Sequence, residues 1–121
     1  MKQIADDVWQ IPLLPRNAVN AYLVGDVIVD AGYTNHGKKV VAAVEGHEVR
    51  AHALTHVHND HAGGSRHVHE ALGVPVWIGA GDAEFLRTGT APPPEHGWLA
   101  PVARLSAAPA VPVDRELRED D

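Results

Sequence analysis

The chain has 121 residues, enough for one domain or for one half of a larger one. Its formal net charge is −6 with no local cluster of Lys and Arg, which argues against a nucleic-acid partner bound through its phosphates. Cysteine is absent, so disulfides, thiolate zinc ligands and a Cys nucleophile are excluded. No apolar run has the length of a membrane span, and the acidic start does not resemble a secretory signal. We therefore expect a cytoplasmic protein without a membrane partner.

Apolar periodicity predicts alternating strands and helices as far as residue 86. Gly25-Asp26 separates two apolar runs and indicates a hairpin. Valines recur within residues 40–44 at spacings of three and four, typical of a helix with one buried stripe. Gly73 is expected to cap a later helix. The predicted elements are strands at 8–11, 20–24 and 27–30, a helix at 37–45, a strand at 49–55, a helix at 62–72, a strand at 75–78 and a helix at 81–86.

After residue 89 the composition changes. Six prolines in residues 90–112 predict mostly irregular chain, which Trp98 and Leu99 are expected to anchor by core packing, with substrate contact as the alternative. Residues 114–121 form a charge run that we expect to be solvated. The chain therefore divides into a folded unit at 1–89 and a Pro-rich irregular segment with a charged tail at 90–121.

Four potential metal ligands lie in the segment 55–61, THVHNDH. His56 and His58 are two residues apart, so on an extended backbone both imidazoles point to one side. Asp60 and His61 add a hard oxygen and another nitrogen. Imidazole is the preferred zinc donor, and a carboxylate tolerates zinc, iron or manganese. The pattern predicts a site for two adjacent metals, with the four side chains near a common point even without metal; the alternative is a His-rich surface loop.

A hydrophobic strand ends in Asp30-Ala31-Gly32, and after a helix and a further strand comes the H-x-H-x-D-H motif with a trailing Gly pair. This order of motifs resembles the metallo-β-lactamase superfamily. The resemblance runs from about residue 4 to residue 86. It implies a layered α+β or α/β fold, the N-terminal half of an αβ/βα sandwich with a mostly antiparallel or mixed sheet and helices on one face. Residues 1–89 would be that half.

The resemblance also implies roles for the ligand residues. His56 and His58 would hold the first metal, and Asp60 and His61 the second, with Zn²⁺ in both sites of the complete fold and Fe or Mn as alternatives. Asp30 would support the metal loop through hydrogen bonds without ligating. In a complete enzyme two metals activate a water, and Asp60 would be catalytic by orienting this nucleophile and accepting its proton.

The rest of the family pattern is missing: a further His, a bridging Asp and a final His all follow a long segment in that family. His96 is the only histidine after His69, and its surroundings do not match, so we do not expect it to ligate. The chain therefore resembles the N-terminal half of a hydrolase, as a truncated or cleaved product or with its other half on another chain. His52 shares strand parity with Leu54 and His56, and we expect it to be packed in the core, with support of the ligands as the alternative.

Three functions remain open. The first is a metal-dependent hydrolase of a small-molecule thioester, lactone or related ester, similar to glyoxalase II. The second is a mononuclear iron dioxygenase of the persulfide type, and the third is a non-catalytic folded fragment. A true β-lactamase is disfavoured because those enzymes are exported and no signal is visible.

The predicted sheet has a face that needs a cover. Residues 21–24 and 27–29 are apolar on both sides, as in sheets that are covered on both faces. A second copy could cover the free face in a two-fold homodimer that imitates the full sandwich. The alternative is that residues 90–112 fold back over it, using Trp98, Leu99 and Leu105.

Overall fold

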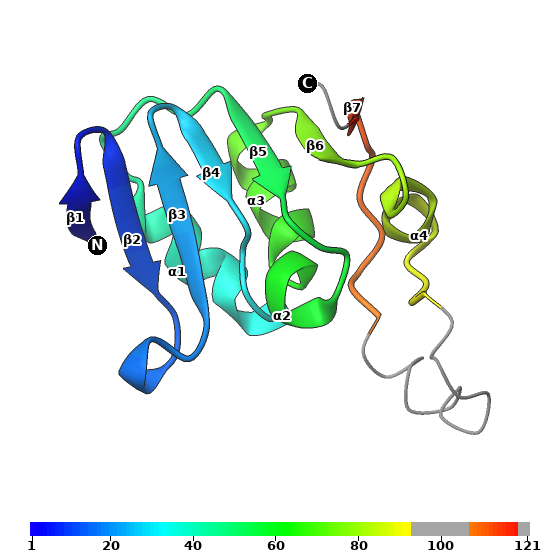
Figure 1. The fold of residues 1–121 in the computed structure, drawn as a ribbon, viewed down its shortest axis with the longest axis horizontal. Coiled ribbons are helices and arrows are strands. Elements are labelled where there is room, and N and C mark those ends of the chain that lie inside the picture. The colour runs from blue at the N-terminus through cyan, green and yellow to red at the C-terminus, as the bar shows by residue number, and fades with distance from the viewer. Residues whose placement is uncertain (93–106, 119–121) are drawn as a thin grey trace.

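Seven strands form one mixed sheet in which spatial order follows sequence order (Figure 1). The computed structural model describes residues 1–92 and 107–118. The strands run antiparallel from the first to the fourth and parallel from the fourth to the seventh. They are β1 (Lys2–Ala5), β2 (Val8–Pro12), β3 (Asn20–Val24), β4 (Val27–Val29), β5 (Ala51–Leu54), β6 (Val76–Gly79) and β7 (Arg115–Leu117). This mixed sheet confirms the predicted fold class and the hairpin at Gly25-Asp26.

Helices connect the parallel strands, as parallel pairing requires. The helices are η1 (Pro15–Asn17), η2 (Thr34–His36), α1 (Gly37–Ala43), α2 (Asn59–Ala62), α3 (Ser65–Leu72) and α4 (Ala83–Thr88). Helices α1 and α3 contact each other and lie behind the sheet in Figure 1. No helix within residues 1–92 or 107–118 is long and apolar enough to cross a membrane.

The main core lies between these helices and one face of the sheet. Leu23 and Ile28 are fully buried there together with Val40 of α1 and Val68 of α3. On β3 the alternation is clear, because Tyr22 is half-buried and Val24 is 43% exposed on the opposite face. Within the described residues, no helix therefore covers that face as α1 and α3 cover the first. What covers it in solution stays a prediction.

The helix predicted at 62–72 begins earlier and is interrupted. Residues 59–62 form α2, and α3 begins at Ser65, with Gly63 and Gly64 between them. A Cβ on Gly64 would collide with the Ala31 carbonyl oxygen and lie 2.9 Å from the Gly37 nitrogen. The glycine therefore lets the start of α3 approach the end of β4 and the start of α1 more closely than any larger residue would.

The charged tail predicted at 114–121 is not irregular throughout, because Arg115–Leu117 form β7, although the side chains of residues 114–118 are exposed or half-buried. Its backbone pairs with β6, and the Asp114 carboxylate accepts the Val76 amide hydrogen at 2.8 Å. Arg87 Nη2 lies 3.0 Å from Glu116 Oε2. At the edge of a sheet, charged side chains remain partly exposed while the backbone is paired.

Strand β1 was likewise not predicted; all of its residues are exposed, so it lacks an apolar pattern. The other predicted elements agree with the structure to within two residues at their ends. Residues 90–92 and 107–112 contain no helix or strand, as expected. The expectations for His96, Trp98, Leu99 and Leu105 lie outside the described residues.

Candidate metal centre

The predicted ligand segment leaves the sheet at the carboxyl ends of its parallel strands. Strands β4 and β5 are parallel, with Val29 opposite Ala53. The residues that follow them, Asp30 and Thr55, therefore meet at one edge of the sheet. This is the edge where open α/β sheets place their ligand sites.

Asp30 joins the two ends of the segment. Its carboxylate accepts hydrogen bonds from the Thr55 amide (2.8 Å) and the Thr55 hydroxyl (2.8 Å), and lies 2.9 Å from His61 Nδ1. The side chain is nearly buried, and the backbone of Asp30 has φ +64°, a conformation that a non-glycine residue adopts at a cost of about 1–3 kcal/mol. Asp30 makes the hydrogen bonds expected of a residue that supports the loop; its role toward a metal stays a prediction.

This contact also decides which nitrogen of His61 is free. A carboxylate can only accept, so His61 Nδ1 carries the proton that faces Asp30. In the neutral ring Nε2 then keeps its lone pair, and Nε2 lies 3.6 Å from Asp60 Oδ2. A fixed tautomer of this kind is how supporting carboxylates prepare a histidine to bind a metal.

Thr55 has the same effect on His56. The single Thr55 hydroxyl proton is directed at Asp30, so Thr55 Oγ1 must accept the hydrogen bond from His56 Nδ1, 3.0 Å away. The lone pair of His56 is thereby left on Nε2. His56 and His61, which contact the hydrogen-bonded Thr55 and Asp30, therefore both have Nε2 free to bind a metal.

The rings lie side by side on an exposed surface. The His56 and His58 rings are stacked with an interplanar angle of 8° and centroids 5.9 Å apart, as their spacing of two residues predicts. The His56 and His61 centroids are 4.8 Å apart. His58 and His56 are exposed, and the Asp60 side chain is 42% exposed.

The four side chains are therefore neighbours in pairs, but they do not form a finished site. Among the residues that the structure describes, no three His, Asp or Glu side chains are placed to hold one metal ion. The four side chains were expected to lie near one common point, and they do so only in part. Exposed side chains lack the packing that would fix their rotamers. The chemical type of the donors suits a divalent ion. The Nε2 lone pairs of His56 and His61 point away from the hydrogen bonds made by Nδ1, and the Asp60 carboxylate is accessible.

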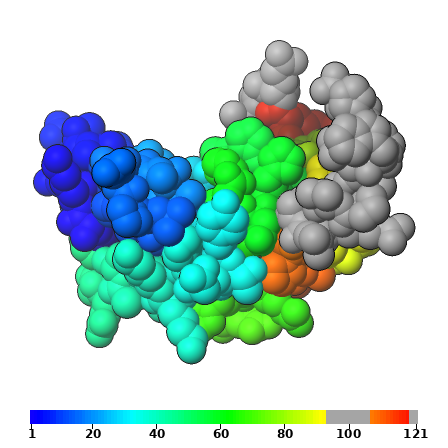
Figure 2. All heavy atoms as spheres, turned by 90° about the horizontal axis from the view of Figure 1, so that it is seen from below, coloured from blue at the N-terminus to red at the C-terminus, as the bar shows by residue number. Residues whose placement is uncertain are grey.

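A small cavity adjoins the ligand residues. It measures about 200 Å³, and Figure 2 looks onto this end of the molecule, hollowed between the blue and the green segments. Typical small-molecule sites measure about 300–1,000 Å³, so this cavity has room for only part of a ligand. It is lined by Ala18, Val19, Asn20, Tyr22, Asp30, Asp60 and His61.

The family model of the Metallo-beta-lactamase superfamily matches residues 14–121. The chain belongs to the metallo-beta-lactamase superfamily. This confirms the resemblance on which the fold and the ligand roles were predicted.

Solved structures of superfamily members have the same fold. BJP-1, a subclass B3 metallo-beta-lactamase of Bradyrhizobium japonicum, is 22% identical with a TM-score of 0.80, and the match covers 98% of this chain and 45% of that one. LRA-12, a class B3 di-zinc enzyme from an Alaskan soil metagenome, is 19% identical with a TM-score of 0.81 and coverages of 99% and 46%. MIM-1 from Novosphingobium pentaromativorans is 25% identical with a TM-score of 0.77 and coverages of 95% and 43%.

This metallo-beta-lactamase-fold chain thus spans somewhat less than half the length of these structures, consistent with an N-terminal half. No curated protein matches it in sequence. Likeness at such identities establishes the fold, while substrate and activity have to be argued from the residues of the site.

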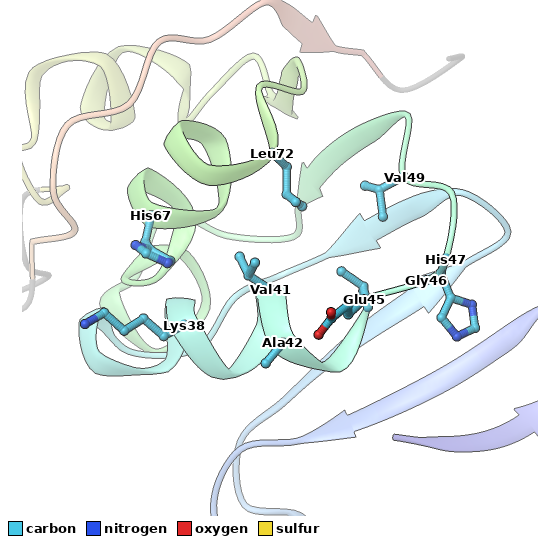
Figure 3. Close-up of a pocket in the computed structure, with 10 residues that line it drawn as sticks. Lys38, Val41, Ala42, Glu45, Gly46, His47, Val49, His67 and Leu72 are labelled. Carbon is cyan, nitrogen blue, oxygen red and sulfur yellow. The ribbon is translucent and has the colours of Figure 1, made fainter.

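A larger cavity of about 620 Å³ lies elsewhere, on the helical side of this metallo-beta-lactamase fold (Figure 3). Its walls come from α1, α3 and the turn after α1, with Val41 and Leu72 among its apolar lining and Lys38 and His67 toward one end. None of the four predicted ligands lines it. The predicted ligands Asp60 and His61 line the smaller cavity instead, and we take that cavity as the candidate site for the chemistry of its lining and not for its size.

Some contributors to the site were not predicted. Asp82, the residue before α4, accepts a hydrogen bond from the Val57 amide at 3.3 Å and so supports the loop. Tyr22 reaches the small cavity because it pairs with Val29, next to Asp30. The predicted hairpin could have indicated Tyr22, whereas no local signal marks Asp82.

Proposed function

We propose that this chain supplies one half of the metal centre of a metal-dependent hydrolase that acts on a thioester, lactone or related ester. The observation that carries the proposal is the Asp30–His61 contact, which leaves His61 Nε2 available beside Asp60. Membership of the superfamily and the H-x-H-x-D-H spacing support it. Zn²⁺ is the ion expected, with Fe or Mn as alternatives.

In this proposal His56 and His58 hold one ion, and Asp60 and His61 hold the other. Such ions, when bound, lower the pKa of water toward neutrality and polarise the electrophilic oxygen of the substrate. Asp30 keeps the proton of His61 on Nδ1. Asp60, which is accessible from the cavity, orients the nucleophile and accepts its proton.

The proposed centre needs donors beyond these four. Two protein donors for each ion are fewer than the three or four of working zinc sites. We therefore expect the remaining donors to come from a C-terminal half or from a second copy of the chain placed over the free face of the sheet. The 121-residue chain alone should show little or no hydrolase activity.

Titration calorimetry with Zn²⁺, Mn²⁺ and Fe²⁺ tests the ligand set. His58→Ala should weaken zinc binding at least about tenfold, because it removes a donor, whereas His47→Ala, a change at another exposed histidine, should leave it unchanged. Equal affinities in both variants would refute the ligand set. Iron-selective binding with oxygen consumption on a persulfide would favour the dioxygenase.

Light scattering over a range of micromolar concentrations tests the origin of the second half. The homodimer predicts a mass that doubles with concentration, since Tyr22 and Val24 leave an apolar surface on the free face. A monomer at every concentration would exclude a second copy. Robust turnover of a thioester or lactone by such a monomer, abolished by His58→Ala, would contradict the view of an incomplete site.

A further inference from the structure

Two polar side chains are completely buried behind the predicted metal loop. His52 on β5 and Ser65, the first residue of α3, are both 0% exposed. His52 Nε2 lies 2.8 Å from Ser65 Oγ, and His52 Nδ1 lies 3.0 Å from the Ile28 carbonyl oxygen. The expected core packing of His52 is confirmed, but the contact with Ser65 assigns it more than a space-filling role.

The roles in this pair follow from the acceptors. The Ile28 oxygen can only accept, so Nδ1 of His52 carries the proton and Nε2 accepts the hydrogen of the Ser65 hydroxyl. Burial lowers the pKa of His52 to about 4, because the interior disfavours the charged ring. At neutral pH the pair is uncharged, with every side-chain nitrogen and oxygen hydrogen-bonded.

The position of His52 and Ser65 in the chain suggests what the pair does for the predicted metal loop. His52 lies on the strand that leads into the loop, and Ser65 begins the helix that leads out of it. Residues 55–64, with all four predicted ligands, lie between them. Asp30 joins the exposed side of this loop, and the His52–Ser65 bond joins its base inside the core.

We propose that His52 and Ser65 are positioning residues that fix the base of loop 55–64 and so set the distance between its first two ligands and its last two. The inference rests on the proposed metal site, in which His56 and Asp60 serve different ions. An apolar pair at these positions would tolerate a small shift of α3 along β5. A buried hydrogen bond does not, because moving it leaves both partners unsatisfied at a cost that the core cannot recover.

Two variants separate positioning from plain stability. Ser65→Ala leaves His52 Nε2 buried without a partner and should lower Tm by roughly 4–8 °C. The double variant His52→Leu/Ser65→Ala removes both side-chain partners and leaves only the Ile28 carbonyl without the hydrogen from His52, so its Tm should lie between that of Ser65→Ala and that of the parent. If the pair only stabilises the core, the double variant should lose protection evenly along the chain, with no selective change in loop 55–64.

Hydrogen exchange of the metal-free chain is the deciding measurement. The Ala31 amide donates to the His61 carbonyl at 2.8 Å, and the Gly64 amide donates to the Gly32 carbonyl at 3.1 Å, so both report where the loop lies. In the double variant these two amides should exchange about tenfold faster, the equivalent of one hydrogen bond, while amides of β3 keep their rates. Parental rates at both reporters would overturn the proposal.

The control is Ile11→Val, a core change on β2 that should lower Tm modestly without selective exchange in the loop. Zinc titration of the double variant gives a second readout, expected to be about tenfold weaker than the parent. If the parent itself binds no zinc, the proposed function fails, and the exchange rates still decide whether the pair positions the loop. If the parent binds zinc and the double variant binds it equally with parental exchange, only the positioning role fails.

Discussion

Two contacts hold the same loop, and they differ in almost every physical respect. The Asp30–His61 contact is charged, lies at the surface cavity and involves a His61 side chain that is one-third exposed. The His52–Ser65 contact is neutral and fully buried. The outer contact determines which nitrogen is presented, and the inner contact determines where the backbone lies.

The difference shows how this fold separates chemistry from position. The Asp30 carboxylate can carry a charge beside the cavity because the Thr55 amide and hydroxyl donate hydrogen bonds to it. A dry contact cannot carry charge, and it gains directional precision in return. The three predictions below test each side of this division, from the largest expected effect to the smallest.

Backbone packing at the base of the loop should show the largest effect. Gly64→Ala places a methyl group against the Ala31 carbonyl and the Gly37 nitrogen, and neither backbone atom can move aside cheaply. We expect a loss of about 3 kcal/mol in the free energy of unfolding, measured by urea denaturation. The matched control is Gly79→Ala, since a Cβ there has no neighbour within 4 Å. Equal stability of the two variants would mean that the close approach at Gly64 is not needed.

The sequence predicted most of the first 86 residues because their apolar spacing matches the period of each element. Strands β1 and β7 escaped prediction since both are edge strands held by backbone pairing, which leaves no apolar signature in residues such as Arg115 and Glu116. The break at Gly63-Gly64 escaped as well, because its cause is contact with Ala31, which is distant in the sequence.

For the candidate site, sequence spacing predicted which residues share the loop and that His56 and His58 face one side. It could not predict that no three of the described side chains would converge on one point, since rotamers of exposed side chains are set by surroundings that spacing does not describe. The partner of His52 was equally hidden. In the sequence, Ser65 is simply the serine that begins a helix after the Gly pair. Only the packing of α3 on β5 brings its Oγ to 2.8 Å from His52 Nε2.

Acid should act on the inner contact. Burial lowers the pKa of His52 to about 4, from 6.5 for an ordinary histidine, with the Ile28 hydrogen bond and then Asp30 opposing the shift and His69 adding to it. The folded chain therefore takes up this proton less readily than the unfolded chain. The contribution of His52 to the free energy of unfolding is fully present above pH 6.5. It is lost as the pH decreases toward 4, by on the order of 3 kcal/mol.

Urea midpoints measured between pH 7 and pH 4 test this pH dependence. The double variant His52→Leu/Ser65→Ala should show a flatter dependence over that window, because it lacks the buried ring. Part of the slope should remain, since burial and then Lys39 also lower the pKa of His36. Identical slopes in the parent and the double variant would show that His52 is not the group that acid affects.

The smallest effect is expected from removing the charge of the outer contact while keeping its shape. Asp30→Asn suits φ +64°, because asparagine tolerates the left-handed region better than other residues with a Cβ. Its side-chain oxygen can still accept the Thr55 amide hydrogen, which leaves the NH₂ group facing His61 Nδ1. Two donors then meet, so His61 must move its proton to Nε2 and lose the lone pair proposed to bind the metal. We expect zinc affinity to fall about 10- to 100-fold in titration calorimetry, with Asp26→Asn, at a surface ion pair, as the unchanged control. Parental zinc affinity in Asp30→Asn would show that this carboxylate does not determine which nitrogen of His61 is free. The outer contact would then have no separate chemical role beside the inner one.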